Sequence, residues 1–336
     1  MKASKDNPNS NHLYPGITDI DIEAAIKKSG YPLKTIIANK LRESFYCQEK
    51  WSFIDNKTNE NGSIDIMAQM NLYDYNNQPR VRPILNLLIE CKQSELPYVF
   101  FLTPEVIRTF QYPYICGLPK RNITVFTDDD PSSWSLPIID AFDLTEDVYK
   151  TGSVPNSMTF SKCARQGKEI ELSGNESYQS LVQPLLRSLQ YFEKFVTPPK
   201  TAYYFDCHLP FTIGVLDSPM IGVTINEKSY SSKLIPWVRL YKYESFDSEN
   251  SYDRSKLFAV DIVHKDYFDT YINSKLIPFV SKFSILILKH AEIIARGKAF
   301  AKNMEENPWT DIEPRLEKYS KSKIKKMKNT VDCNRV

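Results

Sequence analysis

The chain has 336 residues, of which 42 % are hydrophobic and 25 % are charged, and its formal net charge is +2. These values are typical of a folded protein with a sizeable core, and they exclude an intrinsically disordered chain. The chain has 10 glycines and neither a GxGxxG nor a GxxxxGK segment, which argues against a glycine-rich nucleotide-binding loop.

Cysteine and histidine usage indicates the compartment and the kind of metal site. The 6 cysteines lie far apart without a CxxC pair, which favours free thiols in a reducing compartment. The 4 histidines are scattered, so a zinc site is not expected. The first eleven residues lack the apolar core of a signal peptide, and no apolar run has the length of a membrane span. We therefore expect a cytoplasmic protein without a membrane contact.

The N-terminal region predicts an arm followed by two helices. Residues 1–16 are polar and are expected to form a flexible arm. Thr18 and Asp19 can cap a first helix over residues 20–29, which Gly30 would end.

A second helix is predicted from Pro32 to Tyr46, because proline is well placed in the first turn of a helix. Its apolar residues follow helical spacing and define one buried face: Leu33, Ile36, Ile37, Leu41 and Phe45. Glu43 lies seven residues after Ile36, at the margin of that face. Its carboxylate is therefore expected to lean over the edge of the sheet on which the helix packs.

Three strands separated by turns are predicted next, over residues 51–55, 64–70 and 84–92. The second strand alternates apolar side chains with Asp65. The third is a nearly continuous apolar run, the composition of a central strand covered on both faces. We expect a meander of three strands preceded by a helix.

The central strand ends in Glu90, Cys91 and Lys92. Because side chains alternate along a strand, Glu90 and Lys92 point to one face and Cys91 to the other. Burying a carboxylate and an ammonium there costs free energy unless the two are paired or hold an ion. The acid and the base at this strand end are therefore candidate functional residues.

The remaining chain predicts further strands and helices of one large α/β domain over residues 17–310. We expect loop with short helical pieces over 96–119, a strand over 122–127, an acidic solvated turn at 128–130, and loop up to Gly174. A helix over 176–196 is expected to kink at Pro184. The later expected elements are strands at 211–216, 220–224, 237–243 and 257–263, then one or two long helices within 266–304.

Residues 311–336 are expected to form a basic C-terminal tail. From Arg315 to Val336 there are eight Lys or Arg against two acids, a local balance of 8 − 2 = +6. Such a tail either contacts phosphates non-specifically or stays solvated and frayed.

Asp65, Glu90 and Lys92 together have the chemistry of metal-dependent phosphodiester hydrolysis. Two carboxylates from neighbouring strands can hold Mg²⁺, with Mn²⁺ as a substitute, and the backbone carbonyl of Cys91 is a third candidate ligand. Lys92 can orient the attacking water or steady negative charge on the phosphate. Glu43 is a candidate to complete the metal shell or to hold a second ion.

In the order of these elements, the chain resembles the PD-(D/E)XK nuclease superfamily, within it restriction-endonuclease-like and Mrr-like proteins. The resemblance covers about residues 30–95 and departs from the family pattern at Ile64, which stands where many members have proline. It implies a restriction-endonuclease-like central mixed β-sheet flanked by helices, here with additional strands and long C-terminal helices. It also implies Mg²⁺ dependence and cleavage of nucleic acid, usually DNA, with a role in restriction or phage defence.

Two other functions fit the same sequence. The chain can be a protein that keeps this fold to bind or sense nucleic acid without cutting it. It can also be an assembly subunit whose C-terminal helices mediate oligomerisation. A homodimer or a partner subunit is compatible with each of the three functions. Intact Asp65, Glu90 and Lys92 favour the nuclease, whereas the lack of a strong basic patch outside the tail argues against both nucleic-acid functions.

Overall fold

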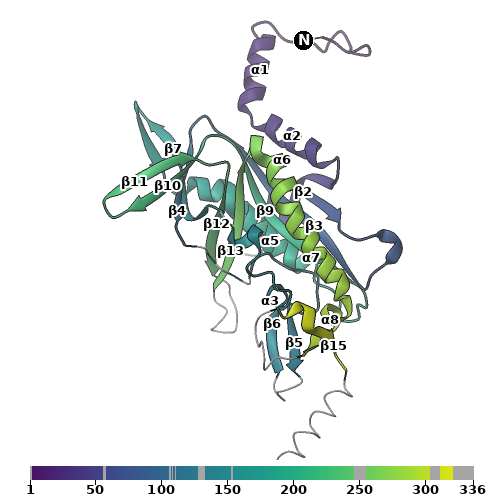
Figure 1. Ribbon diagram of the computed structural model, residues 1–336. Helices are drawn as coiled ribbons and strands as arrows, with labels where there is room; N and C mark the ends of the chain where they lie inside the picture. The colour runs from purple at the N-terminus through teal and green to yellow at the C-terminus, as the bar shows by residue number, and fades with distance from the viewer. Residues whose placement is uncertain are drawn as a thin grey trace, which may run out of the picture.

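The computed structural model describes residues 2–55, 58–105, 107, 109, 111–127, 133–152, 154–245, 255–302 and 311–320. In this part of the chain, a mixed sheet of eleven strands forms the body, and a four-stranded sheet lies at one end of it (Figure 1). The expected α/β class, with a large mixed sheet flanked by helices, is confirmed.

The large sheet has the strand order β1-β2-β3-β9-β13-β12-β7-β4-β10-β11, with β8 paired to β7. Its strands are β1 Tyr46–Ile54, β2 Asn61–Asn71, β3 Val81–Gln93, β4 Tyr98–Thr103, β7 Asn156–Gln166, β8 Glu169–Ser173, β9 Phe205–Asp217, β10 Met220–Asn226, β11 Ser229–Leu234, β12 Trp237–Ser245 and β13 Ser255–His264. The small sheet has the order β15-β14-β5-β6, and its strands are β5 Asn122–Thr127, β6 Ser133–Pro137, β14 Lys298–Ala301 and β15 Leu316–Lys318.

Helices cover both faces of the large sheet (Figure 1). The α-helices are α1 Asp19–Lys28, α2 Tyr31–Leu41, α3 Ile138–Ala141, α4 Val148–Thr151, α5 Gln183–Phe195, α6 Phe268–Tyr271, α7 Ile277–Lys289 and α8 Ala291–Arg296. Short 3₁₀ turns are η1 Tyr75–Asn77, η3 Lys265–Tyr267 and η5 Glu313–Arg315. π-turns precede α5 and α7, as η2 Tyr178–Val182 and η4 Ile272–Leu276.

The predicted meander is confirmed and forms one flank of the large sheet. β1, β2 and β3 pair in sequence, all antiparallel. β9 then pairs with β3 in parallel along its whole length, and β13 pairs in parallel with β9. Strands in such a parallel core are covered on both faces, which explains why β3 is an almost unbroken apolar run.

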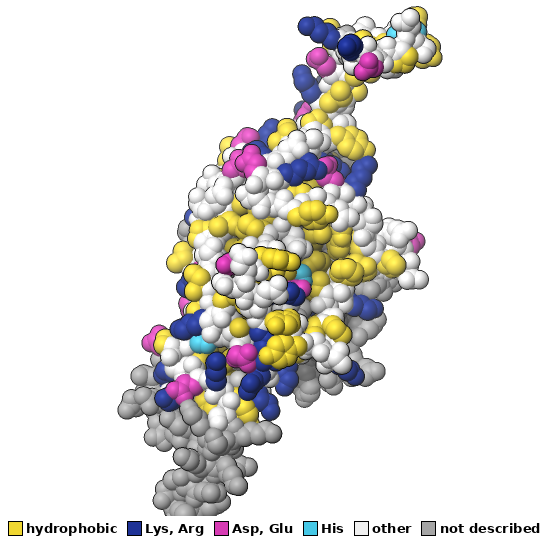
Figure 2. Space-filling model, turned by 90° about the vertical axis from the view of Figure 1, so that its right-hand side faces the viewer, with side chains coloured by type: hydrophobic (Ala, Val, Ile, Leu, Met, Phe, Trp, Pro, Cys, Tyr) yellow, Lys and Arg dark blue, Asp and Glu magenta, His cyan; other side chains and the backbone are white. Residues whose placement is uncertain are grey.

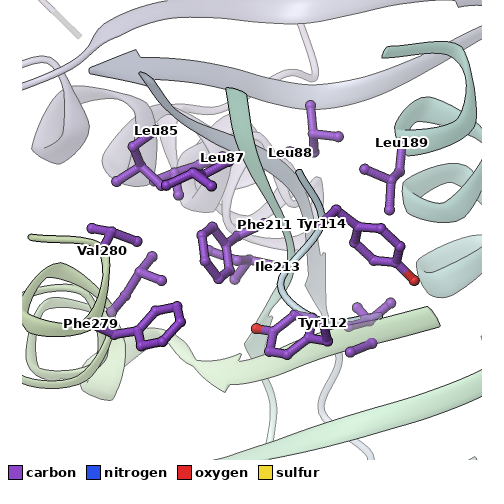
Figure 3. Close-up of a cluster of buried hydrophobic side chains, with 14 of the residues drawn as sticks. Leu85, Leu87, Leu88, Tyr112, Tyr114, Leu189, Phe211, Ile213, Phe279 and Val280 are labelled. Atoms are coloured by element: carbon purple, nitrogen blue, oxygen red, sulfur yellow. The ribbon is translucent and has the colours of Figure 1, made fainter. Parts of the chain in front are cut away.

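The two faces of β3 pack on different helices (Figure 3). Leu85 and Leu87 point toward Val280 of α7, whereas Leu88 points toward Leu189 of α5 (Figure 3). All of these side chains are fully buried. Because side chains alternate, Glu90 and Lys92 share the face of Leu88, and Cys91 lies on the face of α7.

The first helix begins as the sequence predicts, but it stands off the body of the molecule (Figures 1 and 2). Thr18 and Asp21 form a reciprocal capping box at its start, and Gly30 beyond its end has a positive φ of 73°. α1 has no buried residue. Its packing therefore adds little to the core, and its hydrogen bonds are largely local.

The sequence reading is wrong over much of the middle of the chain. β4 lies in the segment expected to be loop with helical pieces, and β7 and β8 lie in the segment expected to be loop up to Gly174. Over residues 211–224 the sequence fits either a hairpin or two successive strands, and the structure has two successive strands, since β10 pairs with β4 and β11. Both β8 and β11 are exposed strands. β11 is mostly polar, whereas β8 alternates Glu169 and Glu171 with Ile170 and Leu172, a short pattern that the prediction missed.

The C-terminal helices are shorter than expected and lead into the small sheet. α8 ends at Gly297, and β14 follows it and pairs with β5 and β15. The acidic turn at 128–130 and residues 321–336 of the basic tail lie outside the described residues. Contrary to expectation, Lys265–Lys289 has the length and apolar composition of a membrane-spanning helix, but its α7 part packs against β3, as a core helix does.

Candidate active site

Asp65 and Glu90 meet where β2 and β3 separate. The antiparallel pairing of these strands ends at Ile66 and Ile89. Beyond that point, the backbone N–H of Cys91 donates to Asp65 Oδ2 at 2.8 Å, and the N–H of Asp65 donates to Glu90 Oε2 at 3.3 Å. Each carboxylate thus accepts a hydrogen bond from the opposite strand, which fixes both acids at the mouth of the separation.

Lys92 pairs with Glu90 along the same strand, as the alternation predicts. Its Nζ lies 2.7 Å from Glu90 Oε1, and the exposed fractions of the two side chains are 28 % and 8 %. Burial raises the pKa of Glu90 above its ordinary value, and the charge of Asp65 adds to this, while Lys92 and Lys34 act in the opposite direction. A positive charge nearby therefore stabilises the ionised form of this acid pair.

Lys34 is a member of this cluster that the sequence analysis missed. It comes from the first half of α2, and its Nζ lies 2.5 Å from Asp65 Oδ1. Burial lowers the pKa of Lys34, but the hydrogen bond and the charge of Asp65 outweigh this, so the pKa is raised overall. The position of Lys34 next to the buried Leu33 is the signal in the sequence that could have identified it. The prediction instead chose Glu43, at the far end of the expected helix.

Glu43 is not on a helix, and this part of the prediction is wrong. α2 ends at Leu41, and the N–H of Phe45 then bonds back to the carbonyl of Leu41, so that the chain turns into β1. Glu43 is exposed in that turn. Ile36, which was expected on the buried face, is 52 % exposed. None of the described hydrogen bonds of Asp65, Glu90 or Lys92 comes from Glu43, and its role as a metal ligand stays an untested prediction.

Cys91 contributes its backbone rather than its thiol. The N–H is held by Asp65, while the side chain is buried on the opposite face, where burial raises the pKa of the thiol. The carbonyl of Cys91 as a metal ligand stays a prediction. The expected free thiols are present in the described part of the chain: Cys47, Cys91, Cys116, Cys163 and Cys207.

The cluster lies at the edge where three parallel strands end. β3, β9 and β13 run in the same direction, and the register aligns Lys92 with Leu216 and Leu216 with His264. Ligands of α/β proteins bind characteristically outside the carboxyl ends of parallel strands. Next to this edge, an open cleft of about 570 Å³ is lined by Gln93 at the end of β3, by residues 94–96 after it, and by Lys27 and Lys28 of α1.

Comparison of the chain with protein-family models, with curated proteins and with solved structures finds no match. The resemblance to PD-(D/E)XK nucleases therefore depends on the residues and the strand order alone.

The residues present fit a magnesium ion with few protein ligands. Among the described residues, there is no group of three or more His, Cys, Asp or Glu side chains placed to hold a metal. Mg²⁺ is usually held by one or two carboxylates together with waters and substrate phosphates. Asp65 and Glu90 supply two hard oxygen ligands, and their proximity is balanced here by two ammonium groups.

Proposed function

We propose that this chain is a nuclease that hydrolyses phosphodiester bonds of nucleic acid, with DNA as the expected substrate and Mg²⁺ or Mn²⁺ as the cofactor. The observation that carries the proposal is the arrangement of Asp65, Glu90 and Lys92. Two carboxylates from separating strands and a lysine two residues after the second acid lie together, partly accessible, at the end of a buried strand.

The proposed roles follow from charge and position. Asp65 and Glu90 would hold the ion, which supplies an activated water and relief of phosphate charge when bound. Lys92 would orient that water or neutralise charge on the phosphate, since its ammonium is a compact point charge beside Glu90. Lys34 would hold Asp65 in position. Lys27 and Lys28 lie in the adjoining cleft, where the backbone of a nucleic acid would pass.

A second candidate is a protein that binds nucleic acid without cutting it. The observation that favours it is the pairing of each carboxylate with a lysine, together with the lack of a third acidic ligand among the described side chains. Such a site has a balanced charge and can bind a phosphate without a metal.

Cleavage of a panel of DNA and RNA substrates in Mg²⁺, Mn²⁺ or EDTA tests the proposal. Glu90→Gln and Lys92→Met should each lower the cleavage rate by at least about a hundredfold, because general acid–base and charge-stabilising groups contribute on this scale. The matched control is Glu292→Gln. Glu292 pairs with Arg80 at 2.8 Å, next to the opposite end of β3, so its loss should leave the rate within about twofold.

The three outcomes separate the candidate functions. Metal-dependent cutting that is lost in both site variants and kept in the control supports the nuclease. Cutting that survives in both variants contradicts the site. Binding of the substrates without any cutting favours the second candidate.

A further inference from the structure

A second pocket lies on the opposite face of the large sheet from the candidate active site. Trp237 forms part of its lining and is aligned through β13 and β9 with Cys91, so both side chains belong to the face of α7. The pocket has a volume of about 430 Å³ and lies between the start of β12, α4 and the helix that runs through η4 into α7. This is the size of a typical small-molecule site.

The inner wall of the pocket is aromatic and rigidly held. Tyr149 stacks on Phe279 with the ring centroids 4.8 Å apart, and its hydroxyl donates to the buried carboxylate of Asp261 at 2.9 Å. Trp237 packs against Tyr271 at 5.3 Å between centroids. Arg239 lies over the rings of Tyr149 and Trp237, at 4.5 and 5.7 Å from their centroids, so a ligand in the pocket meets the edges of these rings. Ring edges that are already ordered can pack against the face of a planar ligand at little entropic cost.

The rim of the pocket is basic. Lys275 and Lys282 line it together with one acid, Asp147, so these three groups carry a net charge of 2 − 1 = +1. Lys282 pairs with Asp147 at 2.7 Å, and within the described part of the chain no ion pair is present at Lys275. The carboxylate of Asp147 also caps α4 by accepting from the N–H of Tyr149 at 3.0 Å, which fixes it in place.

The lining helix departs from regular geometry where it faces the pocket. Ser274 and Lys275 belong to the π-turn Ile272–Leu276, and Pro278 follows in the first turn of α7. π-turns within helices are uncommon and occur frequently at binding sites. Here the turn places a hydroxyl and an ammonium on the same pocket rim.

We propose that this pocket binds a small ligand that joins an aromatic ring to an anionic group, the chemistry of a nucleoside monophosphate. The face of the ligand ring would lie against the edges of Tyr149 and Trp237, and the phosphate would lie between Lys275 and Lys282. The site is distinct from the acid pair of the proposed nuclease and does not depend on it.

Calorimetric titration of the full chain in EDTA tests this, with adenosine 5′-monophosphate, adenosine and inorganic phosphate as probes. The monophosphate should bind saturably and at least about tenfold more tightly than either of the other two, since it alone makes both the aromatic and the charged contacts. Lys275→Ala and Lys282→Ala should each weaken its binding by about tenfold.

The matched control is Lys289→Ala. Lys289 lies on the same helix and pairs with Glu313 at 2.8 Å, and its side chain is 55 % exposed, as is that of Lys282. The control should bind the monophosphate within about twofold of the unaltered chain. Absence of saturable binding, equal losses in Lys282→Ala and Lys289→Ala, or equal affinity for phosphate and monophosphate would each overturn the proposal.

Discussion

Single polar residues buried beside β3 differ in how the protein satisfies them. Glu90 pairs with Lys92 and accepts a hydrogen bond from a backbone N–H. His208 is hydrogen-bonded to an amide, with its Nδ1 2.9 Å from Asn86 Oδ1, and its ring packs edge-on against Phe192. Burial lowers the pKa of His208 to about 4, and Arg82 also lowers it, although Asp206 opposes them. The folded protein therefore keeps this ring neutral.

The low pKa of His208 predicts that this one side chain makes the folded protein less stable in acid. Between pH 6.5 and 4 the unfolded chain takes up a proton at His208 and the folded chain does not, so the free energy of unfolding falls as the pH falls. Relative to His208→Gln, the unaltered protein should lose about 3 kcal/mol across this window. Urea unfolding at several pH values measures the difference. A constant difference, or an equal effect of His12→Gln in the exposed arm, would contradict the assignment.

At the scale of elements, the pattern of the sequence predicts the strands around the acid cluster well, but it misses the buried strand β4 and misplaces the end of α2. β2 and β3 have the clear alternation or apolar run of covered strands, and Asp65, Glu90 and Lys92 follow from them. The end of α2 cannot be predicted in this way, because residues 42–45 have no proline or glycine to mark a turn. Lys34 was missed for a different reason: its role depends on how α2 packs on the sheet and not on a local motif.

Lys34 is predicted to matter more than another lysine of the same helix. Lys40 also lies 2.5 Å from an aspartate, Asp269, but that pair is exposed and away from the acid cluster. Lys34→Met should lower the cleavage rate by roughly tenfold or more, the scale of a lost charged hydrogen bond. Lys40→Met should change it by less than about twofold. Equal rates for the two variants would show that Lys34 has only a structural role.

At the scale of the whole molecule, one buried ion pair joins the second half of the sheet to the helices. Arg239 of β12 donates to both oxygens of Asp261 of β13, at 2.7 and 3.0 Å. The hydroxyls of Tyr112, Tyr149 and Tyr271 also donate to Asp261. This network lies behind the second pocket. No sequence motif predicts it, because its members are far apart in the chain.

Asp261→Asn should destabilise the entire fold. It would leave the fully buried guanidinium of Arg239 without a negative partner, which typically costs about 3–5 kcal/mol. Asp269→Asn, which breaks the exposed pair with Lys40, should cost at most about 1 kcal/mol. Thermal and urea unfolding of the two variants check this. Equal losses of stability would mean that the buried network does not hold the helices to the second half of the sheet.

In the proposed site, Asp65 and Glu90 bind the metal and Lys92 acts on the substrate. The most direct measurement pairs Mn²⁺ binding, followed by electron paramagnetic resonance, with DNA cleavage on the same samples. Asp65→Asn and Glu90→Gln should lose both Mn²⁺ binding and cleavage, whereas Lys92→Met should keep the binding and lose the cleavage. Mn²⁺ binding and cleavage that are unchanged in all three variants would contradict these roles.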